Sequence, residues 1–337
     1  MVRLRSPCIR FFSRQGGMQT GVRWVYNRLN MSQTRKAFLA IIIASLLWAT
    51  TGSTFKLLFL SFDPISIMFL RMLVTSALLF PVFMRYNTVS FRNILRHIVP
   101  VSLYASLNFL LYVVGLAKTT ADSSTILYTI TPLLAVVISR ISIGEKTSRI
   151  KIAGILMGFI GAIFITALPM LERRQSLAGN IQGNILILLA AVTWTLYTTG
   201  SRKLTSVYRY SSLVVTCVTM FTCCVVFLVL TAAVVRTNFI APLATGSNIL
   251  LLLHLCIFVT CVTFFLHQWV IAHTSAVTGT LNTYITPVFA FVINAIVLEE
   301  TLSFAFVIGS VCIGIGTFIA TSEKTVFYVR NKITNRR

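Results

Sequence analysis

Negatively charged residues are scarce in this sequence. Its 337 residues include 7 Asp and Glu against 29 Lys and Arg, and charged residues of both signs make up 11% of the chain. Soluble domains carry about 25% charged residues. Together with a mean hydropathy of +0.87, the shortage of charge excludes both a soluble globular domain and a disordered polar chain.

Residue groups that carry chemistry are also missing. The sequence has no Gly-rich phosphate loop, nucleophile elbow or paired carboxylates, and no Cys and His group with metal-ligand spacing. The cysteines other than Cys8 lie in apolar runs and are predicted to pack as small apolar residues. Lone histidines near the ends of apolar runs are predicted to be packing or interfacial residues: His254, His267 and His273. We therefore expect no catalytic activity, metal or cofactor.

Long apolar runs, by contrast, are abundant. A membrane-spanning helix needs about 20 apolar residues. Runs of this length cover residues 37–59, 64–84, 98–117, 123–142, 150–170, 182–200, 211–235, 249–272, 275–298 and 301–321. Because the connections are too short for a soluble domain, the sequence predicts an all-α integral membrane protein with ten transmembrane helices.

The two halves of the sequence repeat each other. The stretch from Ala121 to Thr166 recurs from Ala276 to Thr321 at a shift of 155 residues, and the tryptophans Trp48 and Trp194 precede matching basic residues. The expected organisation is a five-helix repeat at 37–171, an outer linker at 172–181, a second five-helix repeat at 182–321 and a basic tail at 322–337. Residues 1–36 form a basic leader, expected to be disordered or an over-extended start; a targeting segment is the alternative.

The basic residues predict how the chain crosses the membrane. Seventeen of those after residue 31 fall in loops and tails on one side, and the other side holds Lys118, Arg173, Arg174 and Arg236. Cytoplasmic loops are enriched in Lys and Arg, so both termini are expected in the cytoplasm, at the cell inner or plasma membrane. Five spans in each repeat then give the two repeats inverted polarity. Charges scattered among loops do not form a stripe for binding nucleic acid.

Several of these features occur together in one known family. They are Trp48 to Lys56 in the first span, Pro64 and Arg71 in the second, Pro132 and Pro287, and the spaced pairs Glu145 to Gly154 and Glu300 to Gly309. Because of the order and duplication of these features, the chain resembles the EamA-type branch of the drug/metabolite transporter superfamily. The resemblance covers nearly all of residues 37–321. The resemblance implies a ten-span carrier. It does not identify a substrate, because the superfamily carries amino acids, metabolites, nucleotide sugars and lipophilic cations.

A substrate site is predicted near the middle of the membrane, between the repeats. Trp48 and Trp194 lie about 17 Å along their spans, and an indole at that depth needs either a hydrogen-bond partner or a cavity. Polar and aromatic residues predicted at or near the same depth are Tyr104, Asn108, Tyr128, Asn282 and Tyr284. We expect these residues to line a substrate cavity; the alternative is that they hydrogen-bond neighbouring helices.

Arg71 is a predicted charge inside the second span. Such a charge costs about 2.5 kcal/mol or more unless it pairs or reaches the surface. Two explanations stay open. Arg71 either binds an anionic group of the substrate, or it is structural and reaches Asp63, Asp122 or carbonyl groups at helix ends.

The acidic residues all map to loops or span ends. Exchange of a lipophilic cation for protons needs a membrane-buried acid, so a multidrug proton antiporter is disfavoured. Glu145 and Glu300 are predicted to be structural and can cap a helix N-terminus. The basic residues at two other span ends, Lys56 and Arg202, are predicted to be interfacial anchors.

Glycines and prolines predict close packing and a hinge. Small residues recur at helix-face spacing in the fifth and tenth runs: Gly154, Gly158, Gly161, Gly309, Gly314 and Gly316. They are expected to pack the halves together, or two protomers in a homodimer. Pro132 and Pro287 remove a backbone donor in mid-span and are the predicted hinge for alternating access.

The expected function is transport of small organic solutes, such as amino acids or nucleotide derivatives, by alternating access between the two repeats. Small-molecule substrate and membrane lipid are the expected partners. A flippase for lipids or lipophilic compounds is the alternative within transport, and it would need a cavity open sideways to lipid. An integral-membrane enzyme and a structural or signalling protein are less favoured.

Labelling of single cysteines in intact cells tests the predicted topology. In a background without the native cysteines, a cysteine at Gln175 should react with an impermeant thiol reagent and one at Ser206 should not. Permeabilised cells provide the control, because the Ser206 position should then react. The reverse pattern would falsify the inverted assignment.

Overall fold

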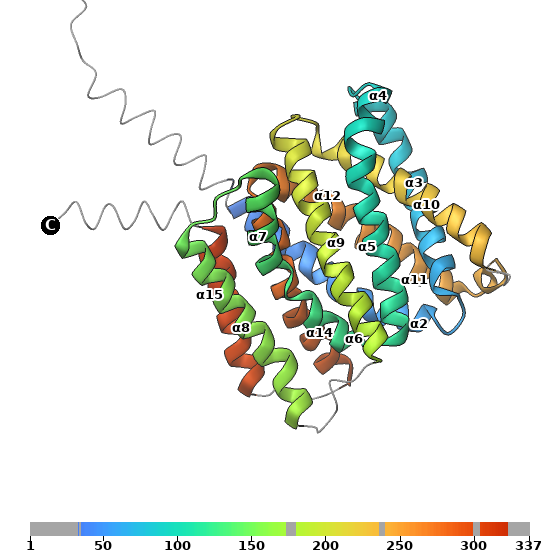
Figure 1. The fold of residues 1–337 in the computed structure, drawn as a ribbon. Coiled ribbons are helices and arrows are strands. Elements are labelled where there is room, and N and C mark those ends of the chain that lie inside the picture. Colours follow the sequence, from blue (N-terminus) through green and yellow to red (C-terminus); the bar gives the residue numbers. More distant parts are fainter. Residues whose placement is uncertain (1–32, 34, 173–179, 236–239, 299–303, 323–337) are drawn as a thin grey trace, which may run out of the picture.

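The computed structural model describes residues 33, 35–172, 180–235, 240–298 and 304–322; the side chains at 122, 166–172, 294–298, 304 and 305 lie outside that description. Within these ranges the chain is helical and contains no strand (Figure 1). Among the described residues, eight helical segments are long and apolar enough to cross a membrane. They are Arg35–Leu58, Pro64–Tyr86, Phe91–Lys118, Ser123–Ile143, Ile181–Ser206, Ser212–Val234, Gly246–His273 and Ala276–Ile293.

The segments of the first half follow the predicted runs. Helix α2 (Thr51–Leu58) ends the first span, and α3 (Pro64–Tyr86) is the second. The third consists of α4 (Phe91–Asn93), the π-helix η1 (Ile94–Ile98) and α5 (Val99–Lys118). The fourth is α6 (Ala121–Tyr128) followed by α7 (Thr131–Ile143), and α8 (Arg149–Glu172) coincides with the fifth run.

The second half has a matching succession of helices. Helices α9 (Ile181–Ser206) and α10 (Ser212–Val234) are followed by the short 3-10 helix η2 (Ala241–Ala244). Next come α11 (Gly246–Cys256), the π-helix η3 (Ile257–Val262) and α12 (Thr263–His273), which form one continuous span. The last helices are α13 (Ala276–Thr280), α14 (Asn282–Leu298) and α15 (Phe304–Thr321). The all-α membrane class is thus confirmed, and the count of ten crossings stays a prediction.

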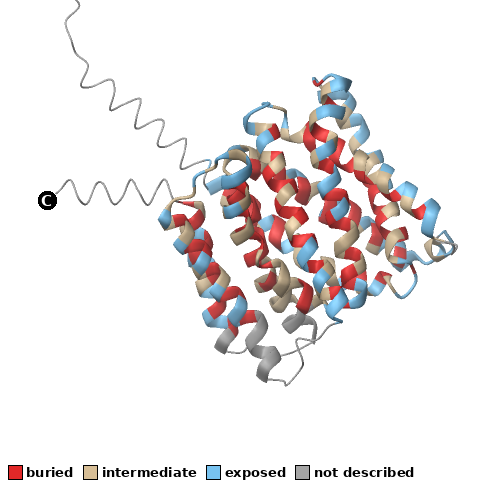
Figure 2. Ribbon diagram, in the orientation of Figure 1, coloured by how far each residue is buried: buried red, intermediate tan, exposed pale blue. Residues whose placement is uncertain are grey.

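The outward faces of the long helices carry large apolar side chains, and exposed residues run along these helices in Figure 2. On α10 the large apolar side chains Val225, Leu228 and Val229 are 50% to 61% exposed, whereas Thr219 and Cys223 are fully buried. The same pattern of outward Leu, Ile, Val and Phe recurs on the other long helices. Because hydrocarbon solvates such side chains, the outward faces fit contact with lipid and the small polar residues pack between helices.

Equivalent helices of the two halves start in the same way. The side chain of Thr120 accepts a hydrogen bond from the backbone N–H of Ser123 at 3.0 Å, and thereby caps α6. The side chain of Ser275, 155 residues later, accepts one from Thr278 at 3.0 Å and caps α13. Both caps satisfy an N–H group that the helix itself leaves without a partner.

Helices α8 and α15 pack side by side and antiparallel through glycines (Figure 1). A Cβ on Gly154 would lie 2.7 Å from the carbonyl oxygen of Gly316, and one on Gly161 would lie 2.6 Å from that of Gly309. Gly158 faces the ring of Tyr284 instead. The predicted packing of the halves is therefore observed for these two pairs, and only a residue without a side chain fits there.

The fourth and ninth spans are both interrupted within their first half. Helix α6 ends at Tyr128 and α7 begins at Thr131, so the break directly precedes Pro132. The break between α13 and α14 falls at Leu281, and Pro287 lies within α14 beyond it. Proline excludes the donor that would continue the helix. That reason applies directly to Pro132, and the second break lies too far ahead of Pro287 to have the same cause.

Candidate functional site

Two tryptophans from different halves meet in the middle of the bundle. The rings of Trp48, in the first span, and Trp194, on α9, pack edge to face with their centroids 5.9 Å apart. Phe264 lies against both indoles, and His267 stacks on Trp194 at 4.7 Å. The Nε1 atom of Trp48 donates to the carbonyl oxygen of Val259 at 3.2 Å. Edge-to-face contacts of this kind stabilise aromatic clusters beyond the area that they bury.

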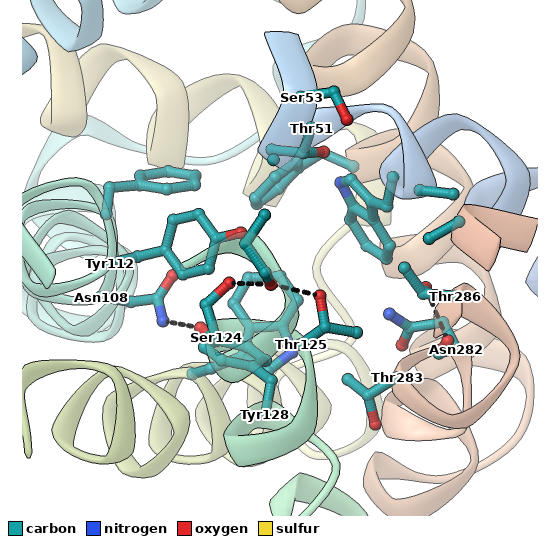
Figure 3. A pocket seen from close by; sticks show the side chains of 18 of the residues that line it. Thr51, Ser53, Asn108, Tyr112, Ser124, Thr125, Tyr128, Asn282, Thr283 and Thr286 are labelled. Atoms are coloured by element: carbon teal, nitrogen blue, oxygen red, sulfur yellow. Dashed lines mark hydrogen bonds between the residues drawn. The ribbon is translucent and has the colours of Figure 1, made fainter. Parts of the chain in front are cut away.

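A cavity of about 150 Å³ lies beside this aromatic cluster, and residues of both halves line it. Its aromatic lining is Trp48, Phe109, Tyr112, Tyr128, Trp194 and Phe264. Its polar lining is Thr51, Ser53, Arg71, Asn108, Ser124, Thr125, Asn282, Thr283 and Thr286. Figure 3 shows Asn108, Tyr112, Ser124 and Tyr128 on one wall and Asn282, Thr283 and Thr286 on the opposite wall.

The polar walls are held in place by helix backbone. The amide nitrogen of Asn108 donates to the carbonyl oxygen of Ala190 at 2.7 Å and to the hydroxyl of Tyr128. On the opposite wall, the Thr286 hydroxyl donates to the backbone carbonyl of Asn282 at 2.8 Å. With the amide of Asn282 turned so that its nitrogen faces an acceptor, that nitrogen donates to the carbonyl of Gly279 at 2.7 Å. These contacts fix the direction of the side chains, and a preorganised polar site of this kind binds with less entropic loss.

The cationic group of the cavity is Arg71 on α3, whose side chain is 3% exposed. Its Nε atom donates to the hydroxyl of Thr260 at 2.5 Å and its Nη2 atom to the carbonyl of Val259 at 3.3 Å. The guanidinium carbon lies 5.4 Å from the ring centre of Phe109 and 5.7 Å from that of Phe55. Two neutral oxygens and two aromatic faces thus surround a buried positive charge.

Polar contacts join the two halves at both ends of the bundle. At the end where α9 and α12 finish, here called the Arg202 end, Lys151 of α8 donates to Ser275 at 2.7 Å and to Thr278 at 2.8 Å. The carboxylate of Glu145 accepts from the backbone N–H of Ala276 at 3.2 Å and lies 3.7 Å from Arg202. All of these contacts join the first half to the second, so polar contacts connect the halves at this end.

At the opposite end, here called the Lys56 end, Thr119 donates across the halves to the side-chain oxygen of Asn184 at 2.6 Å, and Lys118 to that of Gln182 at 3.4 Å. Lys56 bonds within its own half. The Nζ atom of Lys56 donates to the carbonyl of Leu116 at 2.8 Å and to that of Thr119 at 2.7 Å. Arg202 donates in the same way to the carbonyls of Ile271 and Ala272, each at 2.9 Å. Leu116 and Ile271 are separated by the repeat shift of 155. The predicted anchors Lys56 and Arg202 therefore occupy matching places at the ends of α5 and α12.

The sequence profile of the EamA-like transporter family matches this chain twice, over residues 35–167 and 181–322. The chain belongs to the EamA-like transporter family. An uncharacterized transporter of Clostridium kluyveri is 25% identical over 308 residues, which cover 89% of this chain and 98% of the relative. One of Bacillus subtilis is 22% identical over 295 residues, covering 84% and 92%. A solved crystal structure shares the fold with a TM-score of 0.66 at 20% identity, covering 86% of this chain and 96% of that one.

The chain is accordingly a membrane transporter, and most of the predicted site residues converge on one cavity. The residues that line it are Trp48, Arg71, Asn108, Tyr128, Trp194 and Asn282. Tyr104 does not: its side chain is 42% exposed, on the side of α5 away from the buried Ala105 and Phe109. Tyr284 is fully buried against Gly158. Counting residues along a helix gives depth, and depth does not say which way a side chain points.

The cavity is also lined by residues that the sequence analysis did not single out. Tyr112, Ser124 and Thr286 line the cavity and lie four residues from Asn108, Tyr128 and Asn282. Residues four apart share a helix face, so this spacing was available as a signal. Each of the three lies closer to the Lys56 end than the predicted residue in the same span. The cavity therefore extends from mid-depth towards that end.

His267 was predicted to be a packing or interfacial residue near a span end, and it lies in the aromatic core. Its side chain is 2% exposed, its ring stacks on Trp194, and its Nε2 atom lies 3.4 Å from the hydroxyl of Thr198. The packing part of the prediction holds. No pattern in the sequence pointed to the contact with Trp194.

Two partners predicted for charged residues need correction. Asp63 caps α3 by accepting from the N–H groups of Ile65 and Ser66, so it is not the partner of Arg71. The side chain of Asp122 lies outside the described residues. Glu145 does accept from a helix N-terminus, but that helix is α13 of the other half. Glu300 also lies outside the described residues.

Proposed function

We propose that this transporter moves small organic solutes, such as metabolites, by alternating access between two inverted repeats. The observation that carries the proposal is the central cavity, which both halves line at the level of Trp48 and Trp194. A site between the halves changes its exposure when one half rocks against the other. A site within one half would not.

The glycine contacts between α8 and α15 support the inverted arrangement. The repeat shift of 155 converts Gly154 into Gly309 and Gly316 into Gly161. It therefore converts the contact Gly154–Gly316 into the contact Gly161–Gly309. A set of contacts that stays the same when the two halves are exchanged is called isologous, and it is the kind that a two-fold axis produces. Because the two helices run antiparallel, such an axis lies perpendicular to them. For helices that cross a bilayer, that direction is in the membrane plane.

The position of the cavity relative to the two ends supports alternation. The halves are joined by polar contacts of Glu145 and Lys151 at the Arg202 end, and the cavity extends towards the Lys56 end. The breaks in the fourth and ninth spans lie next to cavity residues, Tyr128 before one break and Asn282 after the other. We infer that these breaks, with Pro132 and Pro287, act as the hinge on which the cavity changes access.

A matched pair of tyrosine variants tests the site. Metabolites that raise the melting temperature of the detergent-purified protein identify ligands, because a ligand that binds only the folded state stabilises it. For such a ligand, Tyr128→Phe and Asn282→Ala should weaken binding roughly 2- to 12-fold, the range for one lost hydrogen bond. Tyr104→Phe removes the same hydroxyl on the outer face of α5 and should bind like the wild type. Uptake into proteoliposomes should follow the same order.

Equal effects of Tyr104→Phe and Tyr128→Phe would contradict a site in this cavity. Trp48→Phe, Trp194→Phe and Asn108→Ala extend the comparison to the remaining walls, and each side chain is compatible with an apolar helix. If all of the cavity variants fail to accumulate in the membrane while Tyr104→Phe accumulates, these residues serve packing instead. Movement of a labelled lipid between leaflets, without solute uptake, would favour the flippase alternative.

A further inference from the structure

Arg71 is held by a local irregularity in the span that faces it. In the π-helix η3, the carbonyl of Val259 accepts from Arg71 Nη2 at 3.3 Å, and the hydroxyl of Thr260 accepts from Arg71 Nε at 2.5 Å. A π-turn displaces the backbone from the regular helical hydrogen-bond pattern and leaves carbonyl groups for other donors. The second span of one half is therefore fixed to the eighth span of the other through the guanidinium group.

These contacts do not satisfy the charge of Arg71. A guanidinium group has five N–H donors, and the oxygen partners among the described residues are the two neutral ones named above. None of the described residues that line the cavity carries a carboxylate, and Arg71 is the cation among them. A buried cation without a counter-ion is unfavourable. The Nη1 atom lies 3.9 Å from the sulfur of Met68, which is a weak acceptor. Arg71 lines the cavity, and its remaining donors leave a place for an anionic group.

The rest of the cavity lining is aromatic or neutral. Phe109, Phe264 and Trp48 supply aromatic faces, and Asn282 and Thr286 supply an amide and a hydroxyl on the opposite wall. The volume of about 150 Å³ is that of a cavity that accepts a benzene ring. A nucleotide is several times larger. An organic cation would meet Arg71 without a described acid to balance it.

We propose that the cavity binds a small organic carboxylate, with the carboxylate on the guanidinium of Arg71 and the apolar body against the aromatic wall. The proposal rests on the proposed function, since it places the substrate in the same cavity. A planar guanidinium binds a carboxylate through two parallel hydrogen bonds. A cavity that binds a carboxylate in this way restricts the substrates from metabolites in general to small monoanions, and excludes nucleotides and amines.

Three small ligands that each carry one benzene ring test the proposal by direct binding. Benzoate, benzamide and benzylamine share a ring and differ in the charge of one substituent. By titration calorimetry at neutral pH, the wild-type protein should bind benzoate at least about tenfold more tightly than benzamide, and benzylamine most weakly. Arg71→Gln should bind benzoate and benzamide equally. Arg71→Lys keeps the charge without the planar fork and should retain part of the preference. Arg85→Gln, at the exposed end of the same helix, is the control and should bind as the wild type does.

Equal binding of benzoate and benzamide by the wild-type protein would overturn the proposal, and so would failure of all three probes to bind. Either result leaves the proposed function to be judged by Tyr128→Phe and Asn282→Ala with other metabolites. If Arg71→Gln does not fold, the wild-type comparison and Arg71→Lys still decide. A lower melting temperature of Arg71→Lys with the benzoate preference unchanged would make Arg71 a structural residue and overturn the binding role.

Discussion

Gly161→Leu should prevent the transporter from accumulating as a stable protein in the membrane. A Cβ at this position would lie 2.6 Å from the carbonyl oxygen of Gly309 and 2.9 Å from the Cβ of Cys312. Because the nearest atom is backbone, no side-chain movement relieves the clash, and α8 and α15 must separate. Overpacking of a core costs about 1–3 kcal/mol when side chains can adjust, so we expect a loss of at least that size here.

The same helix pair supplies a matched control. Gly314 on α15 is exposed, and an added Cβ would meet nothing within 4 Å, so Gly314→Leu should accumulate and melt like the wild type. Gly309→Leu should be as damaging as Gly161→Leu, since the two residues form one contact. Membrane yield, size-exclusion profile and melting temperature measure these effects. If Gly161→Leu behaves like Gly314→Leu, helices α8 and α15 are not in contact.

Lys151→Met combined with Glu145→Gln should open the Arg202 end. Lys151 donates two hydrogen bonds across the halves, and Glu145 accepts one from the N-terminus of α13. Hydrogen bonds to charged groups contribute about 1.5–3 kcal/mol each. Ser275 and Thr278 remain hydrogen-bonded to each other at 2.8 Å, so local structure should survive the change. The main effect should therefore be on the equilibrium between the two arrangements of the halves.

The measurement is the reactivity of one buried cysteine. Thr198 is fully buried in this structure and lies beside His267, between the tryptophan pair and the Arg202 end. In a background without native cysteines, the cysteine of Thr198→Cys should react with a thiol reagent at least about tenfold faster when Lys151→Met and Glu145→Gln are also present. The reason is that a shift of 1.4 kcal/mol changes an equilibrium tenfold. Lys203→Met removes an exposed charge near the end of α9 and should leave the rate unchanged. An unchanged rate in the double variant would show that these contacts do not hold the end closed.

The membrane architecture could be predicted from sequence because hydrocarbon imposes strict rules on composition. Apolar length located the spans, and the duplicated positions of Trp48 and Trp194 pointed to two residues that do meet, with ring centroids 5.9 Å apart. The depth of Asn108 and Asn282 was enough to place them in one cavity. The rotation of each helix was not predictable from depth, and for this reason Tyr104 was assigned to the cavity although it points outwards.

Other parts of the site depend on local geometry that has no sequence pattern. The π-helix η3 brings Val259 and Thr260 to Arg71, and nothing in residues 257–262 signals a π-turn. Glu145 precedes α8 in the chain and was expected to be structural, as a helix cap, yet it caps α13 of the other half. Such long-range partners follow from how the halves dock. A single sequence holds no record of that docking.

The indole of Trp48 is a fluorescent group that is hydrogen-bonded to the carbonyl of Val259. This carbonyl accepts hydrogen bonds from the indole of Trp48 and from Arg71, one from each of the first two spans. An anion that draws the guanidinium group away changes the electric field at an indole that shares its acceptor. Emission from Trp48 should therefore shift when the cavity fills, without an added dye. Substitution of Trp24 and Trp269 by phenylalanine would leave the two indoles of the cavity, Trp48 and Trp194, for stopped-flow measurement of binding.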